Sequence, residues 1–395
     1  LACGSDITRR NVFARKNYFY PDLPKGYQIT QDKTPVCVGG GVDIKTSAGS
    51  RRVQLHHIHL EEDAGKSIHA DNEADTLLDY NRAGTALIEI VTDPVMRSSE
   101  EAAACVAEIR KLVRYLDICD GNMEEGSLRC DANVSIRPVG SSTLGTKVEI
   151  KNMNSMRNVQ RAIDAEVERQ KRVLAKKEQI VQQTRLFDAD TGRTHAMRTK
   201  ETMNDYRYFP DPDLSPVVVS DEWLAAITAQ MPPLPHELYA KFVTQYKLPE
   251  YDAAVLTDTK EVALYFDEMC RHTTNHKAAS NWVMGPVKSY LNENGLEMND
   301  FPVRAETLAG LVGLIDENAV SHTAAAQQLF PLLVQQPGKT ARQLAETHNL
   351  MQQSDDTTLQ AVIDEVLAAH PQKVKEYRFD GKKNLAGMFM GEVMK

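Results

Sequence analysis

The chain has 395 residues, of which 42% are hydrophobic and 26% charged, and its formal net charge is −9. This length predicts two or three domains, and no stretch approaches the about 20 apolar residues of a membrane-spanning helix, so we expect a water-soluble protein. The acidic balance argues against a protein that coats nucleic acid without specificity. Residues 371–395 are nevertheless rich in Lys and Arg. Such a segment either contacts one RNA or is simply a solvated surface.

Several common functional motifs do not occur in the sequence. The six cysteines form no C-x-x-C pair, which disfavours a zinc site and indicates reduced thiols in an intracellular protein. Neither a P-loop nor a G-x-G-x-x-G turn occurs, so ATP would have to be held differently. No nucleophile elbow is present, and glutamine hydrolysis is therefore not expected in this chain. The sequence starts at Leu1 without a signal peptide, and we expect it to be a fragment.

The first chemically dense segment spans residues 56–66 and combines three histidines with three acids. Because carboxylates dominate and cysteine is absent, this set favours Mg²⁺ over structural zinc. Lys66 follows the last acid by three residues and could neutralise a phosphate. The alternative is an acidic turn at the surface.

The next predicted element is a strand over residues 86–91, which is apolar except for Glu89. We expect this strand to be buried on both faces, where a carboxylate is costly unless it is paired, protonated or bound to a metal. The alternative is a glutamate at a strand end that reaches water.

Two helices follow in the first half of the chain. Ser98 and Glu101 predict a capping box, and apolar residues continue at helical spacing to Leu116. Ser155 is expected to cap a second helix, whose apolar stripe contains Val159 and Ile163. Both helices carry charge on the opposite face, so we expect them to lie on one side of a sheet.

Two strands with polar faces are predicted over residues 128–138 and 146–152. In the first, Arg129, Asp131 and Asn133 alternate with apolar residues. This polar face favours a lined cavity over an ordinary solvated surface. In the second, Val148 and Ile150 point one way and the charged residues the other.

From about residue 221 onward the pattern is mostly helical, which places the main boundary near residues 219–221. Residues 231–235 (MPPLP) are interpreted as a linker or a helix start.

Six segments resemble the GatB/GatE family of tRNA-dependent amidotransferases. They are residues 15–31 (RKNYFYPDLPKGYQITQ), 60–66 (LEEDAGK), 79–90 (DYNRAGTALIEI), 123–133 (MEEGSLRCDAN), 151–155 (KNMNS) and 205–210 (DYRYFP). The likeness continues through residues 280–285 (SNWVMG) to 387–394 (GMFMGEVM), so that it covers essentially the whole chain.

The resemblance implies an α+β fold in three parts. An antiparallel-sheet cradle catalytic domain is expected over residues 1–223, an all-α helical domain over 224–335, and a small helical tail that contacts tRNA over 336–395. The implied activity uses ATP and Mg²⁺ to phosphorylate the side-chain carboxylate of a misacylated Glu-tRNA(Gln) or Asp-tRNA(Asn). Ammonia from the glutaminase (A) subunit then displaces phosphate, and the C subunit holds the A and B subunits together. A non-discriminating aminoacyl-tRNA synthetase is a further expected partner, and no membrane is involved.

The resemblance also implies roles for individual residues. Glu62 and Glu89 match the family's metal-binding acids, and the candidates for a second ion or its surroundings are Glu61, Glu124, Glu125 and Asp131. Membership of the motifs suggests phosphate and carboxylate binding by Lys16, Lys66, Arg129, Lys151 and Arg207. The expected nucleotide-binding residues are Arg15, Asn133 and Asn152.

The sequence departs from the family pattern in three places. A family segment with a metal-binding Glu-Val-His motif does not precede Leu1, so we expect an incomplete metal site in this fragment. Gln183 stands where the family commonly has glutamate, and the chain stops short of the usual C-terminus.

Two other functions remain as alternatives. The first is an ATP-dependent carboxylate–amine ligase that does not use tRNA, and the second is a tRNA-binding scaffold without chemistry of its own. The sequence does not distinguish Glu-tRNA(Gln) from Asp-tRNA(Asn). The expected location is the bacterial cytoplasm, with a mitochondrion or plastid as alternatives.

Overall fold

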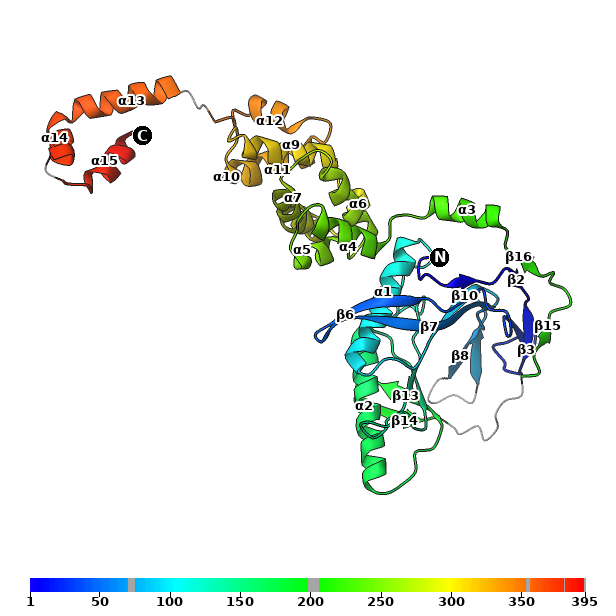
Figure 1. Cartoon of the computed structure of the whole chain (residues 1–395). Helices are drawn as coiled ribbons and strands as arrows, with labels where there is room; N and C mark the ends of the chain where they lie inside the picture. The colour runs from blue at the N-terminus through cyan, green and yellow to red at the C-terminus, as the bar shows by residue number, and fades with distance from the viewer. Residues whose placement is uncertain (70–74, 198–205, 353–355, 380, 394–395) are drawn as a thin grey trace. The chain divides into compact units, whose positions relative to one another are not determined.

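The computed structural model describes residues 1–69, 75–197, 206–352, 356–379 and 381–393 (Figure 1). The chain divides into two compact units. Unit 1 comprises Leu1–Ala240 with Asp258–Lys260, and unit 2 comprises Lys241–Thr257 with Glu261–Lys395. Within the described ranges every strand belongs to unit 1, and unit 2 is helical. The predicted combination of α+β and helical parts is therefore confirmed.

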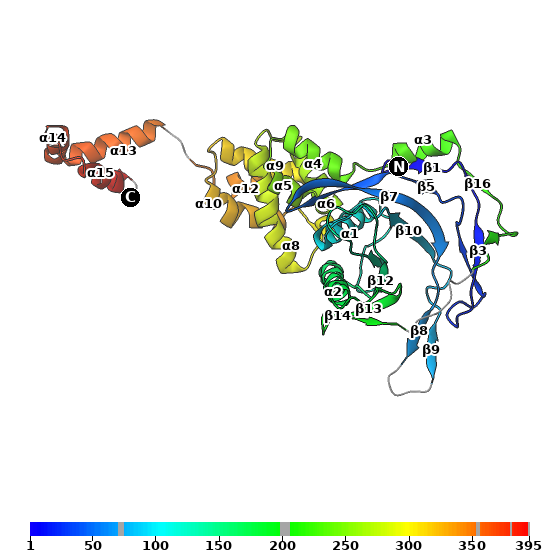
Figure 2. The same cartoon turned by 60° about the horizontal axis from the view of Figure 1, so that its bottom comes forward.

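A curved antiparallel sheet forms the centre of unit 1 (Figure 2). Its longest strand, β7 (Gly49–Glu62), pairs along its first half with β6 (Gly41–Thr46). Along its second half, β7 lies between β10 (Ala86–Thr92) and β5 (Cys37–Val38), and β5 also pairs with β1 (Asp6–Ile7). In this sheet β10 is an edge strand.

Helix α1 (Ser99–Tyr115) covers one face of this sheet. Cys105 of α1 joins a buried cluster with Val53 and Leu55 of β7, and all three side chains are almost fully buried. The hydroxyl of Ser98 accepts a hydrogen bond from the Glu101 backbone N–H, as predicted for an N-cap. The reciprocal half of the predicted capping box is wrong, because the Glu101 carboxylate accepts from the Arg97 N–H instead, at 2.6 Å.

Helix α2 (Met156–Ala175) covers a second sheet, whose order is β11 (Ala132–Val134), β12 (Val148–Lys151), β13 (Thr184–Asp188) and β14 (Arg193–Ala196). The only parallel pair described in it is β12–β13. The predicted Ser155 cap is confirmed. Helices α1 and α2 contact each other but cover different sheets, so the prediction that they share one sheet is wrong.

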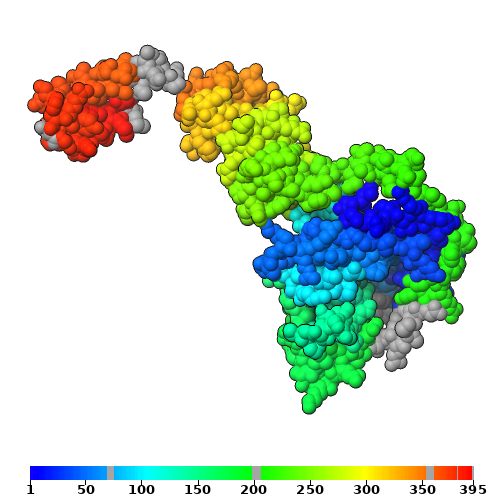
Figure 3. Space-filling view, in the orientation of Figure 1, coloured from blue at the N-terminus to red at the C-terminus, as the bar shows by residue number. Residues whose placement is uncertain are grey.

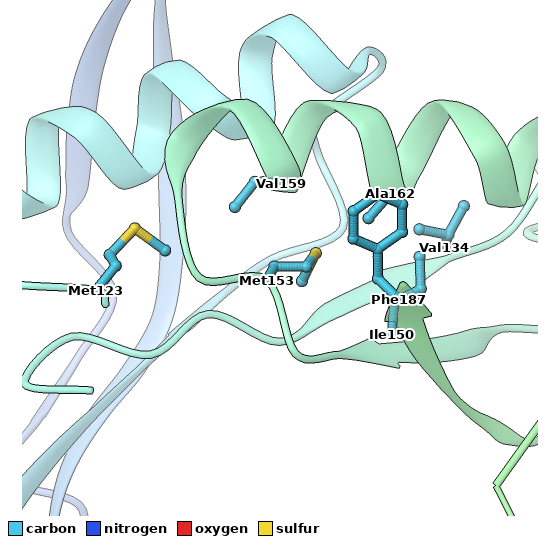
Figure 4. Packing of buried hydrophobic residues seen from close by; sticks show 7 residues of the cluster. All are labelled: Met123, Val134, Ile150, Met153, Val159, Ala162 and Phe187. Carbon is cyan, nitrogen blue, oxygen red and sulfur yellow. The ribbon is translucent and has the colours of Figure 1, made fainter. Parts of the chain in front are cut away.

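The core beneath α2 is closely packed (Figure 4). Val159 and Ala162 point from the helix toward Met153, Ile150 and Phe187, and all five are nearly or completely buried. Val148 and Ile150 are fully buried, which confirms the alternation predicted for this strand.

The strand predicted over residues 128–138 is much shorter than expected. Only β11 is extended and paired, although the alternation of half-buried apolar and exposed polar residues already begins at residue 128. Beyond β11 the chain turns back on itself: Gly145 lies so close to the Ile136 carbonyl that a Cβ there would be 2.2 Å from its oxygen.

Smaller strands complete unit 1. β3 (Ala14–Asn17) lies between β4 (Tyr27–Thr30) and β15 (Phe209–Pro210), and β2 (Arg10–Asn11) pairs with β16 (Val217–Val218). Figure 3 shows this late segment in green beside the blue start of the chain. β8 (Lys66–His69) and β9 (Thr76–Asp79) pair with each other and project from the unit in Figure 2.

Helices continue from α3 (Asp221–Gln230), and α4 (Pro235–Thr244) begins at the last residue of the predicted linker. The later ones are α5 (Glu250–Leu256), α6 (Lys260–Met269), α7 (His276–Trp282), α8 (Lys288–Asn294), α9 (Ala305–Asp316), α10 (His322–Ala324), α11 (Phe330–Gln335), α12 (Ala341–Thr347), α13 (Asp356–Ala369), α14 (Pro371–Phe379) and α15 (Leu385–Val393). Phe242, Phe266 and Leu308 are fully buried among them. None of the helices in the described ranges is both long and apolar enough to cross a membrane.

Candidate functional site

A β-bulge in β7 determines which side chains of the chemically dense segment (residues 56–66) point away from the core. Val91 pairs with His57 and Thr92 pairs with Leu55, so His56 has no partner residue in β10. This extra residue shifts the alternation of side chains by one position. Val53 and Leu55 face the core before the bulge, and Ile58 faces it after the bulge and packs against the same core cluster as α1. His57, His59 and Glu61 consequently share the face opposite the core. Residues 56–62 of the segment therefore belong to a strand and do not form the alternative surface turn, whereas residues 63–65 connect β7 to β8.

Three ligand-type side chains meet on this face. Glu89 of β10 lies directly opposite His59 of β7. The Nε2 atom of His59 is 3.5 Å from an oxygen of Glu61 and 3.5 Å from an oxygen of Glu89. One ligand atom from each residue can be chosen so that all three lie within 4.8 Å of one another. On the other side of the ring, Nδ1 of His59 lies 3.1 Å from Nε2 of His57, which leaves His59 Nε2 facing the carboxylates.

The electrostatics of this carboxylate cluster (His59, Glu61 and Glu89) suit a cation. Partial burial, then the charge of Glu61 and, more weakly, that of Asp131 raise the pKa of Glu89, against the lowering effects of His59 and Lys16. Two carboxylates that repel each other in this way gain from an intervening positive charge. Burial and the neighbouring His59 and His56 lower the pKa of His57, which favours its neutral form.

The expected burial of Glu89 is wrong. Its side chain is 52% exposed, and Ile88 of the same strand is 40% exposed. The reason is the position of β10 at the edge of the sheet: one face rests partly on α1 and the other carries the carboxylate cluster. An apolar sequence therefore does not imply two covered faces here.

Lys16 of β3 lies within electrostatic range of Glu89. Its charge lowers the pKa of Glu89, and its ammonium lies 4.8 Å from the Tyr206 ring centroid and 5.7 Å from that of Tyr18. In the described part of the chain no carboxylate lies within salt-bridge distance of Lys16.

Glu62 does not belong to the group of ligand-type side chains that meet within 4.8 Å. Its carboxylate forms an ion pair with Lys25 and accepts a hydrogen bond from the Ile29 N–H at 2.9 Å. The structure thus brings Glu61, and not Glu62, together with Glu89. This follows from the alternation of side chains along a strand.

Arg129 and Lys151, two of the predicted anion binders, are each paired with an acid. Arg129 lies 2.8 Å from Asp63, which Arg82 also approaches at 3.7 Å. Lys151 donates to Asp131 at 2.8 Å. Burial lowers the pKa of Lys151, but this hydrogen bond and the nearby acids outweigh it, so the net pKa is raised.

The remaining predicted residues are dispersed. Arg15 is held by Asp211 and Asp213 at 2.8 and 2.7 Å, and Asn152 donates to the Phe187 carbonyl at 3.1 Å. Exposed side chains belong to Lys66, Glu124, Glu125, Asn133 and Arg207.

Sequence reasoning included His59 only as one of the three histidines of the chemically dense segment, and it assigned no role to Arg82 or Lys25. His59 could have been assigned with Glu61 from their spacing, because residues i and i+2 of a strand share a face. Arg82 and Lys25 gave no comparable signal, since their acidic partners are distant in sequence.

The carboxylate cluster is suited to a divalent cation such as Mg²⁺ or Mn²⁺. Two carboxylates and one imidazole offer a donor set in which hard oxygen ligands predominate. Structural zinc would instead favour sulfur and nitrogen ligands.

Comparison with known proteins gives consistent matches along the chain. Residues 1–225 match the model of the GatB/GatE catalytic domain, and residues 264–395 match that of the GatB domain. The chain is 48% identical over 395 residues to the B subunit of an aspartyl/glutamyl-tRNA(Asn/Gln) amidotransferase from Trichlorobacter lovleyi. It is 50% identical over 394 residues to a protein of the same name from Pelodictyon phaeoclathratiforme. Each alignment covers 100% of this chain and 82% of the relative. The chain therefore belongs to the GatB/GatE family, among the B subunits of aspartyl/glutamyl-tRNA(Asn/Gln) amidotransferases.

Proposed function

We propose that this protein activates the side-chain carboxylate of Glu-tRNA(Gln), Asp-tRNA(Asn) or both by phosphorylation with ATP. Ammonia then displaces phosphate and leaves Gln-tRNA(Gln) or Asn-tRNA(Asn). The names of the relatives support the overall amidotransferase reaction. The observation that carries the proposal is the meeting of Glu61, Glu89 and His59 beside Lys16.

The proposed reaction brings two anions together, which explains the chemistry required of the site. A free carboxylate does not react with ammonia because its leaving group would be oxide, whereas an acyl phosphate releases phosphate. His59, Glu61 and Glu89 would hold the ion, and Mg²⁺ would supply charge neutralisation at the phosphoryl oxygens.

The basic residues of the site would orient the substrate carboxylate and the triphosphate. For Lys16, this role is supported by the effect of its charge on Glu89. Arg129 and Lys151 already form ion pairs with Asp63 and Asp131. Each would therefore either bind the incoming anion in addition to its acid or exchange the acid for the anion. The proposed contributions of Lys66 and Arg207 to anion binding, and of Arg15, Asn133 and Asn152 to nucleotide binding, rest on their motifs. The same holds for metal ligation by Glu62, Glu124, Glu125 and Asp131.

The proposed assembly contains two further proteins. The A subunit is a glutaminase that releases ammonia from glutamine, the amide donor, and the C subunit connects it to this chain. The mischarged tRNA contacts the cradle (residues 1–223) through its aminoacyl end and the tail (residues 336–395) through its body, and residues 224–335 connect the two along the chain. A non-discriminating synthetase would supply the mischarged tRNA in the bacterial cytoplasm.

Phosphate release from ATP tests this function. It should be measured with the full-length protein, its partner subunits and Mg²⁺, with mischarged tRNA, with uncharged tRNA and without tRNA. We expect turnover only with the mischarged tRNA, because the carboxylate that accepts the phosphoryl group is then present. Turnover that ignores tRNA would instead support a small-molecule ligase, and a lack of turnover under all conditions would support a scaffold.

A further inference from the structure

Four tyrosine rings form a continuous row in unit 1. Tyr20, Tyr18, Tyr206 and Tyr208 meet edge to face in this order, with ring centroids 5.7, 5.9 and 5.9 Å apart. The row has one end in the loop after β3 and the other just before β15. Burial, then the charge of Asp32, and then smaller contributions from Tyr206, Glu61 and Glu89 raise the pKa of Tyr208 to about 12. The hydroxyl of Tyr18 lies 3.3 Å from the side-chain oxygen of Gln28, and the Gln28 amide donates to the backbone carbonyl of Glu62, next to Glu61, at 2.7 Å. The tyrosine row is thus connected to the end of β7 that carries the carboxylate cluster.

The outer end of the row opens to solvent. Phe19 is 90% exposed and Tyr20 is 41% exposed. Both residues line an open groove of about 510 Å³ formed by the loop between β3 and β4. Single exposed aromatic residues are common on protein surfaces. A series of rings that runs from an open groove to a charged cluster needs a more specific explanation.

The backbone holds the two halves of the tyrosine row together. The side-chain amide of Asn17 donates to the carbonyl oxygens of Tyr206 and Arg207 at 3.2 and 2.9 Å. The Asn17 backbone N–H also donates to the Tyr206 carbonyl, at 2.9 Å. Arg207 has a φ of +44°, a conformation that is costly for a residue with a side chain. These hydrogen bonds compensate for the strain and keep the rings of Tyr206 and Tyr208 in line.

The row combines aromatic faces with positive charge. Lys16 lies over the rings of both Tyr206 and Tyr18. Proteins bind unpaired nucleotides with this combination, since bases stack on aromatic rings while cations attract the phosphates.

We propose that the tyrosine row and Phe19 bind the unpaired bases at the 3′ end of the tRNA, and thereby deliver the attached amino acid to Glu61 and Glu89. This inference rests on the proposed function and deepens it. The base of ATP has the same stacking chemistry. A single base, however, covers one ring, whereas several rings in succession suit several consecutive bases.

The test uses leucine substitutions at both ends of the row, in the full-length protein with its partner subunits. Tyr20→Leu and Tyr208→Leu remove the ring but keep apolar bulk, and Tyr20→Phe and Tyr208→Phe keep the ring. Tyr251→Leu serves as the matched control, because Tyr251 is 73% exposed on α5 of unit 2. The KM values for mischarged tRNA and for ATP are measured separately.

We expect each leucine variant to raise the KM for mischarged tRNA by about fivefold or more. The phenylalanine variants and Tyr251→Leu should keep the wild-type KM for tRNA. All variants should keep the wild-type KM for ATP. An increase only in the KM for ATP would assign the row to the nucleotide and overturn the proposal. An unchanged KM for tRNA in both leucine variants would also overturn it, while tRNA-dependent ATP turnover would still support the proposed function.

A binding measurement separates the two proposals if the wild-type protein shows no tRNA-dependent turnover. The probe is a fluorescent unpaired RNA tetranucleotide with the sequence ACCA, followed by anisotropy. Weaker binding by Tyr20→Leu than by Tyr20→Phe would support the stacking role although the proposed function had failed. Equal binding by the wild type and both variants would contradict it.

Discussion

Glu89→Ala is expected to lower amide formation on mischarged tRNA by about two to three orders of magnitude. The substitution removes one of two carboxylates that face each other across β7 and β10 beside His59. Without it, the remaining donors should hold Mn²⁺, a spectroscopic substitute for Mg²⁺, much more weakly. The measurements are product formation at saturating ATP and Mn²⁺ binding by electron paramagnetic resonance.

The same substitution should not destabilise the fold, because Glu89 is half-exposed and its partner Glu61 repels it. A thermal melt should therefore leave the melting temperature unchanged or slightly raised. The control is Glu168→Ala, which removes an exposed carboxylate on α2 and should retain wild-type activity. Wild-type product formation by Glu89→Ala would remove this residue from the site. Parallel assays of Glu62→Ala show whether the carboxylate bound to Lys25 also serves the metal.

Glu166→Ala is expected to lower the free energy of unfolding of unit 1 by about 3–5 kcal/mol. The Glu166 side chain is fully buried, and Arg169 contacts its carboxylate at 2.7 and 2.8 Å. Gln170 and Thr194 donate to it at 2.9 and 3.1 Å, and Arg185 lies 3.6 Å away. Removing the carboxylate would leave two arginines without their shared anion. The measurement is urea unfolding followed by circular dichroism.

Glu168→Ala is again the matched control, since Glu168 pairs with Lys171 on the same helix but is 60% exposed. A surface pair of this kind contributes less than about 1 kcal/mol. Equal destabilisation by the two variants would show that the buried network adds nothing to stability.

The buried network also predicts a pH dependence. Burial raises the pKa of Glu166, but the hydrogen bonds from Arg169, Gln170 and Thr194 outweigh burial and lower the net pKa. A carboxyl group with a depressed pKa in the folded state stabilises the protein above its unfolded pKa of about 4.3. This contribution should disappear as the pH falls through the folded pKa. The difference in stability between wild type and Glu166→Ala should accordingly shrink under acid and stay constant near neutrality.

Local patterns in the sequence predicted the elements that depend on neighbouring residues. The caps at Ser98 and Ser155 need only a hydroxyl and a free N–H one turn ahead. The alternation at Val148 and Ile150 needs only an extended backbone with one covered face.

The predictions that failed depend on contacts between distant segments. Glu101 turns to Arg97, and Glu89 is exposed because β10 ends the sheet. Burial of a whole strand cannot be inferred from its own residues when its neighbours are unknown.

The candidate site shows the same difference between what local patterns predict and what contacts between distant segments decide. The sequence placed ligand-type residues in segments 56–66 and 86–91, but it did not specify which of them meet. The bulge at His56 decides this, because it shifts the phase of β7 and turns His59 and Glu61 toward Glu89. The phase change is visible in retrospect, as apolar residues occupy positions 53 and 55 and then 58 and 60.

Transfer of ¹⁸O tests the central claim most directly. Mischarged tRNA is prepared with ¹⁸O in the side-chain carboxylate of its glutamate or aspartate and converted by the assembled enzyme with unlabelled ATP. Phosphorylation of the carboxylate makes one of its oxygens part of the released phosphate. We therefore predict one ¹⁸O atom in the inorganic phosphate for each fully labelled carboxylate amidated. Phosphate without ¹⁸O, or ¹⁸O found in AMP, would contradict activation by phosphorylation.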